Sequence, residues 1–206
     1  EQNKELTNIV IEQNKTITKL NEKTVEVTNN TQINNTLYNK SFNLNFYLNE
    51  TCKNAINIDE FIDNINLSLD DLEFTGKSGY IEGISNIILR NLKNLRENDR
   101  PIHCSDFKRE ILYIKQNNMW NKEENKKPIL TNVINDISNE NIKQINKWKE
   151  EYPDCINPNS KLNNIYLKIV NNSISGFDQE EKTKNVNKII AKLVRSVTIQ
   201  KNRIEN

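Results

Sequence analysis

Residues 4–28 place side chains of one seam on alternating steps of four and three, without glycine or proline. This heptad spacing predicts a short coiled coil, although two seam positions are polar. Roughly three and a half heptads are too short for a stable isolated helix in water, so we expect sister chains to cover the seam. The alternative is a single amphipathic helix packed on its own domain. The seam residues are Leu6, Val10, Gln13, Ile17, Leu20, Thr24 and Val27.

Residues 29–50 change in character halfway along. Their first half is rich in asparagine and is typical of a polar tether. In the second half, apolar residues alternate with mostly polar ones. This period of two predicts a strand or an extended arm, which would bind a neighbouring subunit. The arm residues are Phe42, Leu44, Phe46 and Leu48.

From residue 51 onward the pattern is typical of an α-rich globular domain. Asp59 is expected to cap a helix that buries Phe61, Ile62 and Ile65 on one face, and Ser68 to cap the next helix. The long helix that follows should end before Pro101, because proline disfavours helix at the preceding residue. A serine at position 138 divides two later helices, and glycine 176 ends another. The helices expected after the two capped ones cover residues 80–95, 128–137, 139–152, 161–174 and 182–200.

Two short strand-like segments, residues 110–115 and 119–122, flank the sequence Gln116-Asn117-Asn118. Asparagine tolerates the positive φ angles of a tight hairpin turn, so the pattern predicts a β-hairpin near residues 110–122. The expected fold class is therefore mainly α with one β-hairpin. Its parts are a coiled-coil helix over residues 1–28, the tether and arm over 29–50, and the globular domain over 51–206.

Composition narrows the class of protein. The chain of 206 residues has 35% hydrophobic residues and a mean hydropathy of −0.79, yet its net charge is only +1. Asparagine supplies the polarity, which indicates an AT-rich genome, and low net charge does not favour overall disorder. No apolar run approaches the ~18 residues of a membrane span, and no signal peptide opens the chain. The start "EQNKEL" lacks a methionine, so we expect a piece of a longer protein.

The cysteines Cys52, Cys104 and Cys155 are odd in number, far apart and without a CxxC pair. This pattern disfavours a disulfide framework and a zinc site, and it favours a reducing compartment. Carboxylates at metal-ligand spacing and glycine-rich phosphate loops are both missing from the sequence. We therefore expect no metal, no cofactor, no small-molecule substrate and no membrane partner.

The segment "RPIHCSDFKREILYIKQNNMW" holds the only histidine, His103, beside Cys104. A nucleophile and a base suggest an enzyme, but neighbours on an extended segment point to opposite faces and cannot easily hydrogen-bond. The favoured interpretation is architecture, in which these side chains anchor the chain. The alternative is a binding surface centred on Arg109, Tyr113 and Trp120.

The last expected helix carries basic residues on one face and apolar residues on the other. Such a helix packs on the core and presents a cationic stripe outward, which suits the tracking of phosphates. The alternative is an ordinary solvated face. The candidate nucleic-acid residues are Lys184, Lys188, Lys192 and Arg195.

Three long blocks carry a family likeness: "FNLNFYLNETCKNAINIDEFI", "LDDLEFTGKSGYIEGISNIILRNLKNL" and "RPIHCSDFKREILYIKQNNMWNKEE". Together with the residues around them, from 42 to 152, they resemble the C-terminal domain of uncharacterised proteins of large nucleocytoplasmic DNA viruses, of the mimivirus and phycodnavirus kind. In that group the domain often follows a coiled coil and an asparagine-rich tether. A Cys/His zinc finger or another DNA-associated module often precedes these, and this sequence contains neither. The resemblance implies a viral protein of the host cytoplasm, in the viral factory, or of the virion.

The expected function is a non-enzymatic module that self-associates and serves a DNA-associated viral protein. Association of subunits multiplies weak contacts by raising the effective concentration. One alternative is a structural or packaging component of the virion that binds nucleic acid through its last helix. A second is an enzyme that uses His103 and Cys104. The expected partners are thus sister chains, a viral protein and nucleic acid.

Overall fold

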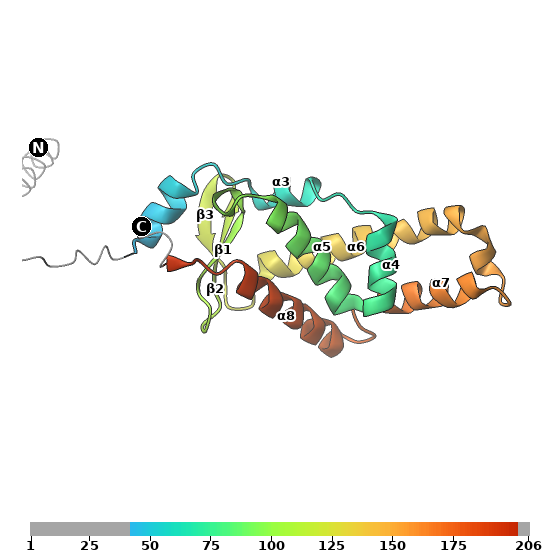
Figure 1. Ribbon diagram of the computed structural model, residues 1–206. Helices are drawn as coiled ribbons and strands as arrows, with labels where there is room; N and C mark the ends of the chain where they lie inside the picture. The colour runs from blue at the N-terminus through green and yellow to red at the C-terminus, as the bar shows by residue number, and fades with distance from the viewer. Residues whose placement is uncertain (1–41, 202–206) are drawn as a thin grey trace, which may run out of the picture. The chain divides into compact units, whose positions relative to one another are not determined.

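The computed structural model describes residues 42–201 (Figure 1). The predicted coiled-coil seam over residues 6–27 and the tether over residues 29–41 lie outside these residues. The described part is mainly helical with a small antiparallel sheet, as the sequence pattern predicts. The helices are α2 (Leu44–Phe46), a π-helical turn (Tyr47–Thr51), α3 (Ile58–Asp63), α4 (Leu69–Ser78), α5 (Tyr80–Asn94), a 3-10 turn (Glu97–Asp99), α6 (Pro128–Glu151), a 3-10 turn (Pro153–Ile156), α7 (Lys161–Asn172) and α8 (Gln179–Ser196).

The sheet contains the strands β1 (Ile102–Asp106), β2 (Ile111–Gln116) and β3 (Met119–Lys122), in that order. The hairpin of β2 and β3 is the predicted one, and its two turn asparagines, Asn117 and Asn118, have φ angles of 52° and 60°. Sequence reasoning missed β1, which pairs with β2 and places His103 opposite Tyr113.

The main core lies on one face of the sheet, where α3, α5, α6 and α8 cover β1 and β2. Alternate sheet residues point into it because side chains along a strand alternate between faces. Helices α5 and α8 each contribute five buried apolar residues, which recur at steps of three and four along one face. The fully buried core side chains include Ile84, Ile87, Ile88 and Leu92 of α5, Ile102 and Cys104 of β1, Leu112 and Ile114 of β2, and Leu130, Ile134, Ile189 and Leu193 of α6 and α8.

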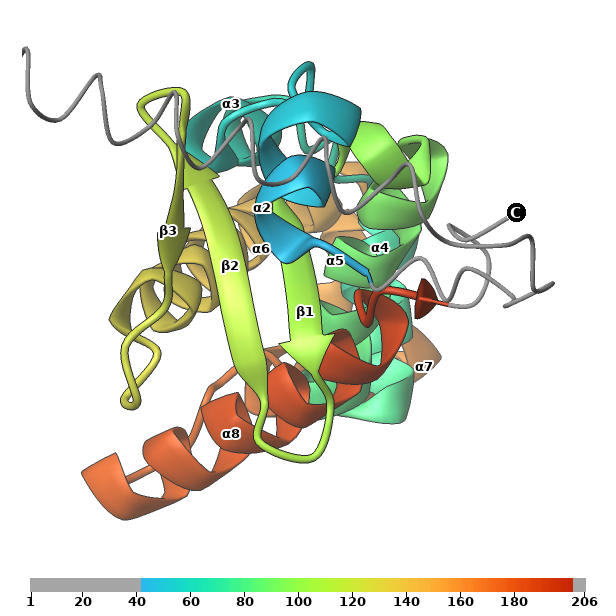
Figure 2. The ribbon, with the colours of Figure 1, turned by 90° about the vertical axis from the view of Figure 1, so that its left-hand side faces the viewer.

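The opposite face of the sheet is covered by residues 42–55 (Figure 2). The prediction of an extended arm over residues 42–48 was wrong, because residues 44–51 are helical. The side-chain oxygen of Asn43 accepts a hydrogen bond from the Phe46 N–H at 3.1 Å and so caps the helix. Alternation would bury Phe46, which is 62% exposed, whereas the adjacent Tyr47 and Leu48 are buried. Partly buried Phe42 and Leu44 pack against the same cluster.

Several helix boundaries also differ from the prediction. Asn57, rather than Asp59, stands at the N-cap of α3. Helix α6 runs unbroken through Ser138, which is buried and hydrogen-bonds the Tyr80 hydroxyl at 3.0 Å instead of capping a second helix. Helix α8 ends at residue 196, because the following residues join the sheet beside Cys104.

That last junction closes the free edge of β1. The Cys104 N–H donates to the Val197 carbonyl at 2.8 Å, and the Ile199 N–H donates to the Cys104 carbonyl at 2.9 Å. A parallel bridge therefore ties the end of α8 to the strand that carries the histidine. None of the helices within residues 42–201 has the length and apolarity that a membrane crossing requires.

A third, smaller cluster joins α4 and α7 to the C-terminal half of α6. It is built on Leu72, Trp148, Cys155 and Ile169, all of which are buried. The Trp148 indole N–H donates to the Glu73 carboxylate at 2.8 Å. This cluster holds α7 in place, so the segment that leaves α7 toward α8 starts from a fixed point.

Candidate functional site

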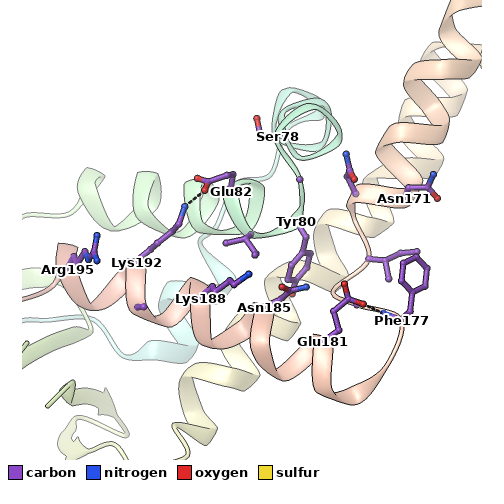
Figure 3. Close-up of a pocket in the computed structure, with 16 residues that line it drawn as sticks. Ser78, Tyr80, Glu82, Asn171, Phe177, Glu181, Asn185, Lys188, Lys192 and Arg195 are labelled. Carbon is purple, nitrogen blue, oxygen red and sulfur yellow. Dashed lines mark hydrogen bonds and ion pairs between the residues drawn. The ribbon is translucent and has the colours of Figure 1, made fainter. Parts of the chain in front are cut away.

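A cleft of about 730 Å³ lies between the first turn of α5, one face of α8 and the segment that joins α7 to α8 (Figure 3). Three of the four predicted nucleic-acid residues, Lys188, Lys192 and Arg195, line it. The fourth, Lys184, is exposed on the same helix but does not line the cleft. The structure thus brings together most of the predicted cationic stripe and gives it a recess to act in.

Helix α8 presents this face outward because its other face is anchored in the core. Val186, Ile189, Ile190, Leu193 and Val194 are buried, and burying each such side chain contributes roughly 1.5–3 kcal/mol. The helix begins at Asp178, whose side chain accepts the N–H of residue 181 at 2.8 Å. Because the apolar face of α8 is buried in the core, the basic residues on the opposite face point toward solvent.

The charges in the cleft are unequal in availability. Lys192 forms an ion pair with Glu82 of α5. Lys188 and Arg195 take part in none of the ion pairs found within residues 42–201. The other acidic residue of the lining, Glu181, accepts the N–H of Phe177 at 2.9 Å. Two cations therefore remain free to meet an anionic ligand.

The start of α5 adds a weaker positive element. Gly79 stands at its N-cap with a φ of 88° and offers no side chain to the first N–H groups. Partial positive charge gathers at such an end, although Glu82 in the first turn offsets part of it. The remaining wall carries amides and apolar groups, including Asn171, Ile174 and Phe177.

The residues suspected of catalysis are placed elsewhere, in the sheet. His103 and Cys104 point to opposite faces, as expected of neighbours on a strand, and Cys104 belongs to the main core. The Nε2 atom of His103 lies 3.5 Å from the sulfur of Cys52, 51 residues earlier in the chain. Sequence reasoning missed Cys52 because nothing in its local sequence marks it as a partner of the histidine.

The pKa values of His103 and Cys52 are shifted in the directions that keep both side chains uncharged. Burial, together with the charge of Arg100, lowers the pKa of His103 to about 4. Burial raises the pKa of the Cys52 thiol to about 11. Both groups are neutral at neutral pH, whereas nucleophilic cysteines require the thiolate.

The histidine ring instead acts as packing. Its centroid lies 5.3 Å from that of Tyr47, at an interplanar angle of 79°, and 5.4 Å from that of Trp120. Edge-to-face and tilted arrangements at these distances stabilise aromatic clusters. These contacts support the architectural interpretation of residues 100–120, in which His103 ties residues 42–55 to the sheet.

The alternative surface of Arg109, Tyr113 and Trp120 is not formed as a single exposed patch. Tyr113 and Trp120 are half-buried against the cluster under residues 42–55. Arg109 is exposed in the turn between β1 and β2, where its backbone N–H donates to the Asp106 carboxylate at 3.0 Å. The sheet thus uses its aromatic residues for internal packing.

Two buried charged residues of this region were not singled out by sequence reasoning. The Lys115 ammonium donates to the carbonyls of Lys53 and Ala55 at 2.7 and 2.8 Å and so caps the end of the covering segment. Glu123 accepts the N–H of Leu130 at 3.1 Å at the start of α6, and burial raises its pKa. The sequence gives no sign that these two charges are buried, because Lys115 stands beside polar Gln116 and Glu123 lies in a run of charged residues.

Within the described part of the chain, no three His, Cys, Asp or Glu side chains gather as metal ligands would. Comparison with known proteins finds no matching family model, no matching curated protein and no matching solved structure.

Proposed function

We propose that this protein is a non-enzymatic module that binds nucleic acid through the cleft beside α8. The observation that supports the proposal is the set of Lys188, Lys192 and Arg195 on one wall of a recess, two of them without an ion-pair partner among the described residues. Along the helix these residues span ~10.5 Å, at 1.5 Å per residue. That length matches about three phosphate-to-phosphate spacings of one stacked strand.

The cations of the cleft act in a chain that is nearly neutral overall. The whole chain has a net charge of only +1, so the protein does not attract nucleic acid through a strong overall field. Recognition must then depend on a small number of positioned cations. Substituting them should remove binding, while substituting cations elsewhere should not.

The experiment is fluorescence anisotropy with labelled duplex and single-stranded oligonucleotides over a series of salt concentrations. Two released counterions give a slope of log K against log salt of about −1.4 for a single strand and about −1.8 for duplex. The double substitution Lys188→Gln and Arg195→Gln should flatten the slope toward zero and weaken binding at every salt concentration.

A matched control removes the same charge from exposed lysines outside the cleft, Lys122→Gln with Lys147→Gln. This control should keep the slope and affinity of the original protein. The proposal fails if no oligonucleotide binds at low salt, or if the control loses as much affinity as the cleft variant.

The second candidate function is self-association through residues 6–27, supported by their heptad pattern. Light scattering of the full chain against a chain that starts at Phe42 tests it, and equal monomer masses would remove it. The two functions are compatible, since joined subunits would present several clefts to one nucleic acid and raise the overall affinity.

The setting that we propose is viral, in the host cytoplasm or the virion, with a DNA-associated viral protein as a further partner. Its support is the resemblance of residues 42–152 to the domain of large DNA viruses. Because the Cys52–His103 pair is buried and neutral, this domain would contribute binding rather than catalysis.

A further inference from the structure

Phe177 is the most exposed large apolar side chain described, with 84% of its surface accessible. It lies in the segment between α7 and α8 and lines the cleft that also holds Lys188 and Arg195 (Figure 3). Single exposed apolar residues are common on protein surfaces. Phe177 differs from the other exposed apolar residues because it shares a cleft with the cations Lys188 and Arg195.

The segment that carries Phe177 is held in a defined conformation. The Asn185 amide donates to the Ser175 carbonyl at 2.9 Å, and the Phe177 N–H donates to the Glu181 carboxylate at 2.9 Å. Gly176 has a φ of 148°, and a Cβ atom there would lie 2.8 Å from the backbone nitrogen of Lys182. The glycine therefore permits the close approach that fixes the segment on the first turn of α8.

An exposed ring on a segment whose backbone is held is available for stacking, and only the rotamer of the ring remains to be ordered on binding. Partly exposed Ile174, at 38%, lies three residues earlier and extends the apolar surface in the cleft. Asn171, from the end of α7, adds an exposed amide on the same side. The recess thus offers an apolar end and a cationic end along one wall.

We infer that the cleft binds single-stranded nucleic acid, with a base stacked on Phe177 and phosphates at Lys188 and Arg195. This inference rests on the proposed nucleic-acid function and names its substrate class. Aromatic rings combined with a cationic groove are the means by which proteins hold single strands without sequence preference. In a duplex the faces of the bases are already stacked on their neighbours, so Phe177 has nothing to stack on.

The length of the cleft sets the size of the ligand. From Glu181 to Arg195 the lining of α8 covers ~21 Å, which corresponds to about six stacked nucleotides of one strand. The two acidic residues of the lining are engaged, Glu181 with the backbone of Phe177 and Glu82 with Lys192. The ion pair with Lys192 offsets the charge of Glu82, whereas Glu181 keeps its negative charge at the Phe177 end of the cleft.

The test compares the full chain with Phe177→Ala and Phe177→Trp, using labelled single strands of twelve thymidines or adenosines and a hairpin duplex. Loss of one stacked base should weaken single-strand binding roughly 5- to 150-fold in Phe177→Ala. Phe177→Trp should restore it, with quenching of the new tryptophan on binding. The slope with salt should stay the same in both, because no phosphate contact is lost.

The control is Phe107→Ala, which removes a 46% exposed ring from the turn between β1 and β2 and should bind as the original protein does. Equal affinity of Phe177→Ala and the original protein, with loss in the Lys188 and Arg195 variant, would overturn the stacking inference and leave the proposed function standing. Tighter binding of the duplex than of either single strand would do the same. Absence of binding to all three probes would remove both.

Discussion

Protonation of the single histidine should destabilise the fold in mild acid. His103 is 1% exposed, and its folded-state pKa is about 4, against an ordinary value of 6.5. Between these values the unfolded chain binds a proton that the folded chain does not. The contribution of the neutral histidine to the free energy of unfolding is therefore fully present above pH 6.5 and is lost as the pH falls toward 4.

The size of the effect follows from the two pKa values. Integration of the proton difference from pH 7 to pH 5 gives a loss of about 2 kcal/mol, and the limiting slope is about 1.4 kcal/mol per pH unit. For a chain of this size a loss of about 2 kcal/mol lowers Tm by roughly 4–8 °C. Burial raises the pKa of the Glu123 carboxyl, so its protonation contributes with the opposite sign and offsets a part of the loss in acid.

The assay is denaturant unfolding at pH 7, 6 and 5 for the original protein and for His103→Gln, followed by tryptophan fluorescence. Because the chain has one histidine, the variant removes the only side chain with an ordinary pKa near 6.5. The variant keeps Glu123, so the difference between the two proteins isolates the histidine. Parallel pH dependence in both would refute the reasoning, and so would an NMR titration that places the pKa of His103 near 6.5 in the folded protein.

Two substitutions test how the layers are held. Lys115→Met removes two charge-assisted hydrogen bonds and leaves the Lys53 and Ala55 carbonyls unpaired, so unfolding free energy should fall by about 3 kcal/mol, whereas exposed Lys122→Met on β3 should change it by less than about 0.5 kcal/mol. Gly83→Ala puts a Cβ atom 2.2 Å from the Thr75 hydroxyl oxygen, so the free energy of unfolding should fall by about 1–3 kcal/mol in thermal unfolding. The control Asn86→Ala, at an exposed position of the same helix, should raise it by a few tenths of a kcal/mol. An unchanged Tm in either buried variant would contradict the packing described.

Much of the fold follows from local pattern. The apolar spacing of α5 and the hairpin at Asn117 and Asn118 were predicted within a residue or two, because both depend on neighbours in sequence. The helical structure of residues 44–51 was not predicted, because their apolar residues alternate as in a strand. The start of this helix depends on one capping asparagine, Asn43. Strand β1 was missed because no Gly, Pro or Asn marks the turn at residues 107–110 that joins it to β2, and because its other partner, Thr198, is remote in sequence.

The candidate site divides in the same way. The cationic face of α8 could be read from sequence spacing alone, because a helix fixes which residues share a side. The recess could not, since it depends on the first turn of α5, about a hundred residues earlier, and on Phe177 in a connecting segment. The histidine's true neighbour, Cys52, was equally hidden, because tertiary contact and not spacing brings the two together.

The Lys201 ammonium lies 5.6 Å from the centre of the Phe42 ring, so the backbone enters and leaves the described domain at one place. Domains whose two ends lie close together tolerate insertion into another protein. They also tolerate circular permutation, in which the ends are joined by a short linker and new ends are made at a surface turn. A permuted chain that opens between Asn117 and Asn118 would keep all the strand pairs while reversing which half is made first. We therefore expect that the order in which the two halves are synthesised can change without a change in the final architecture.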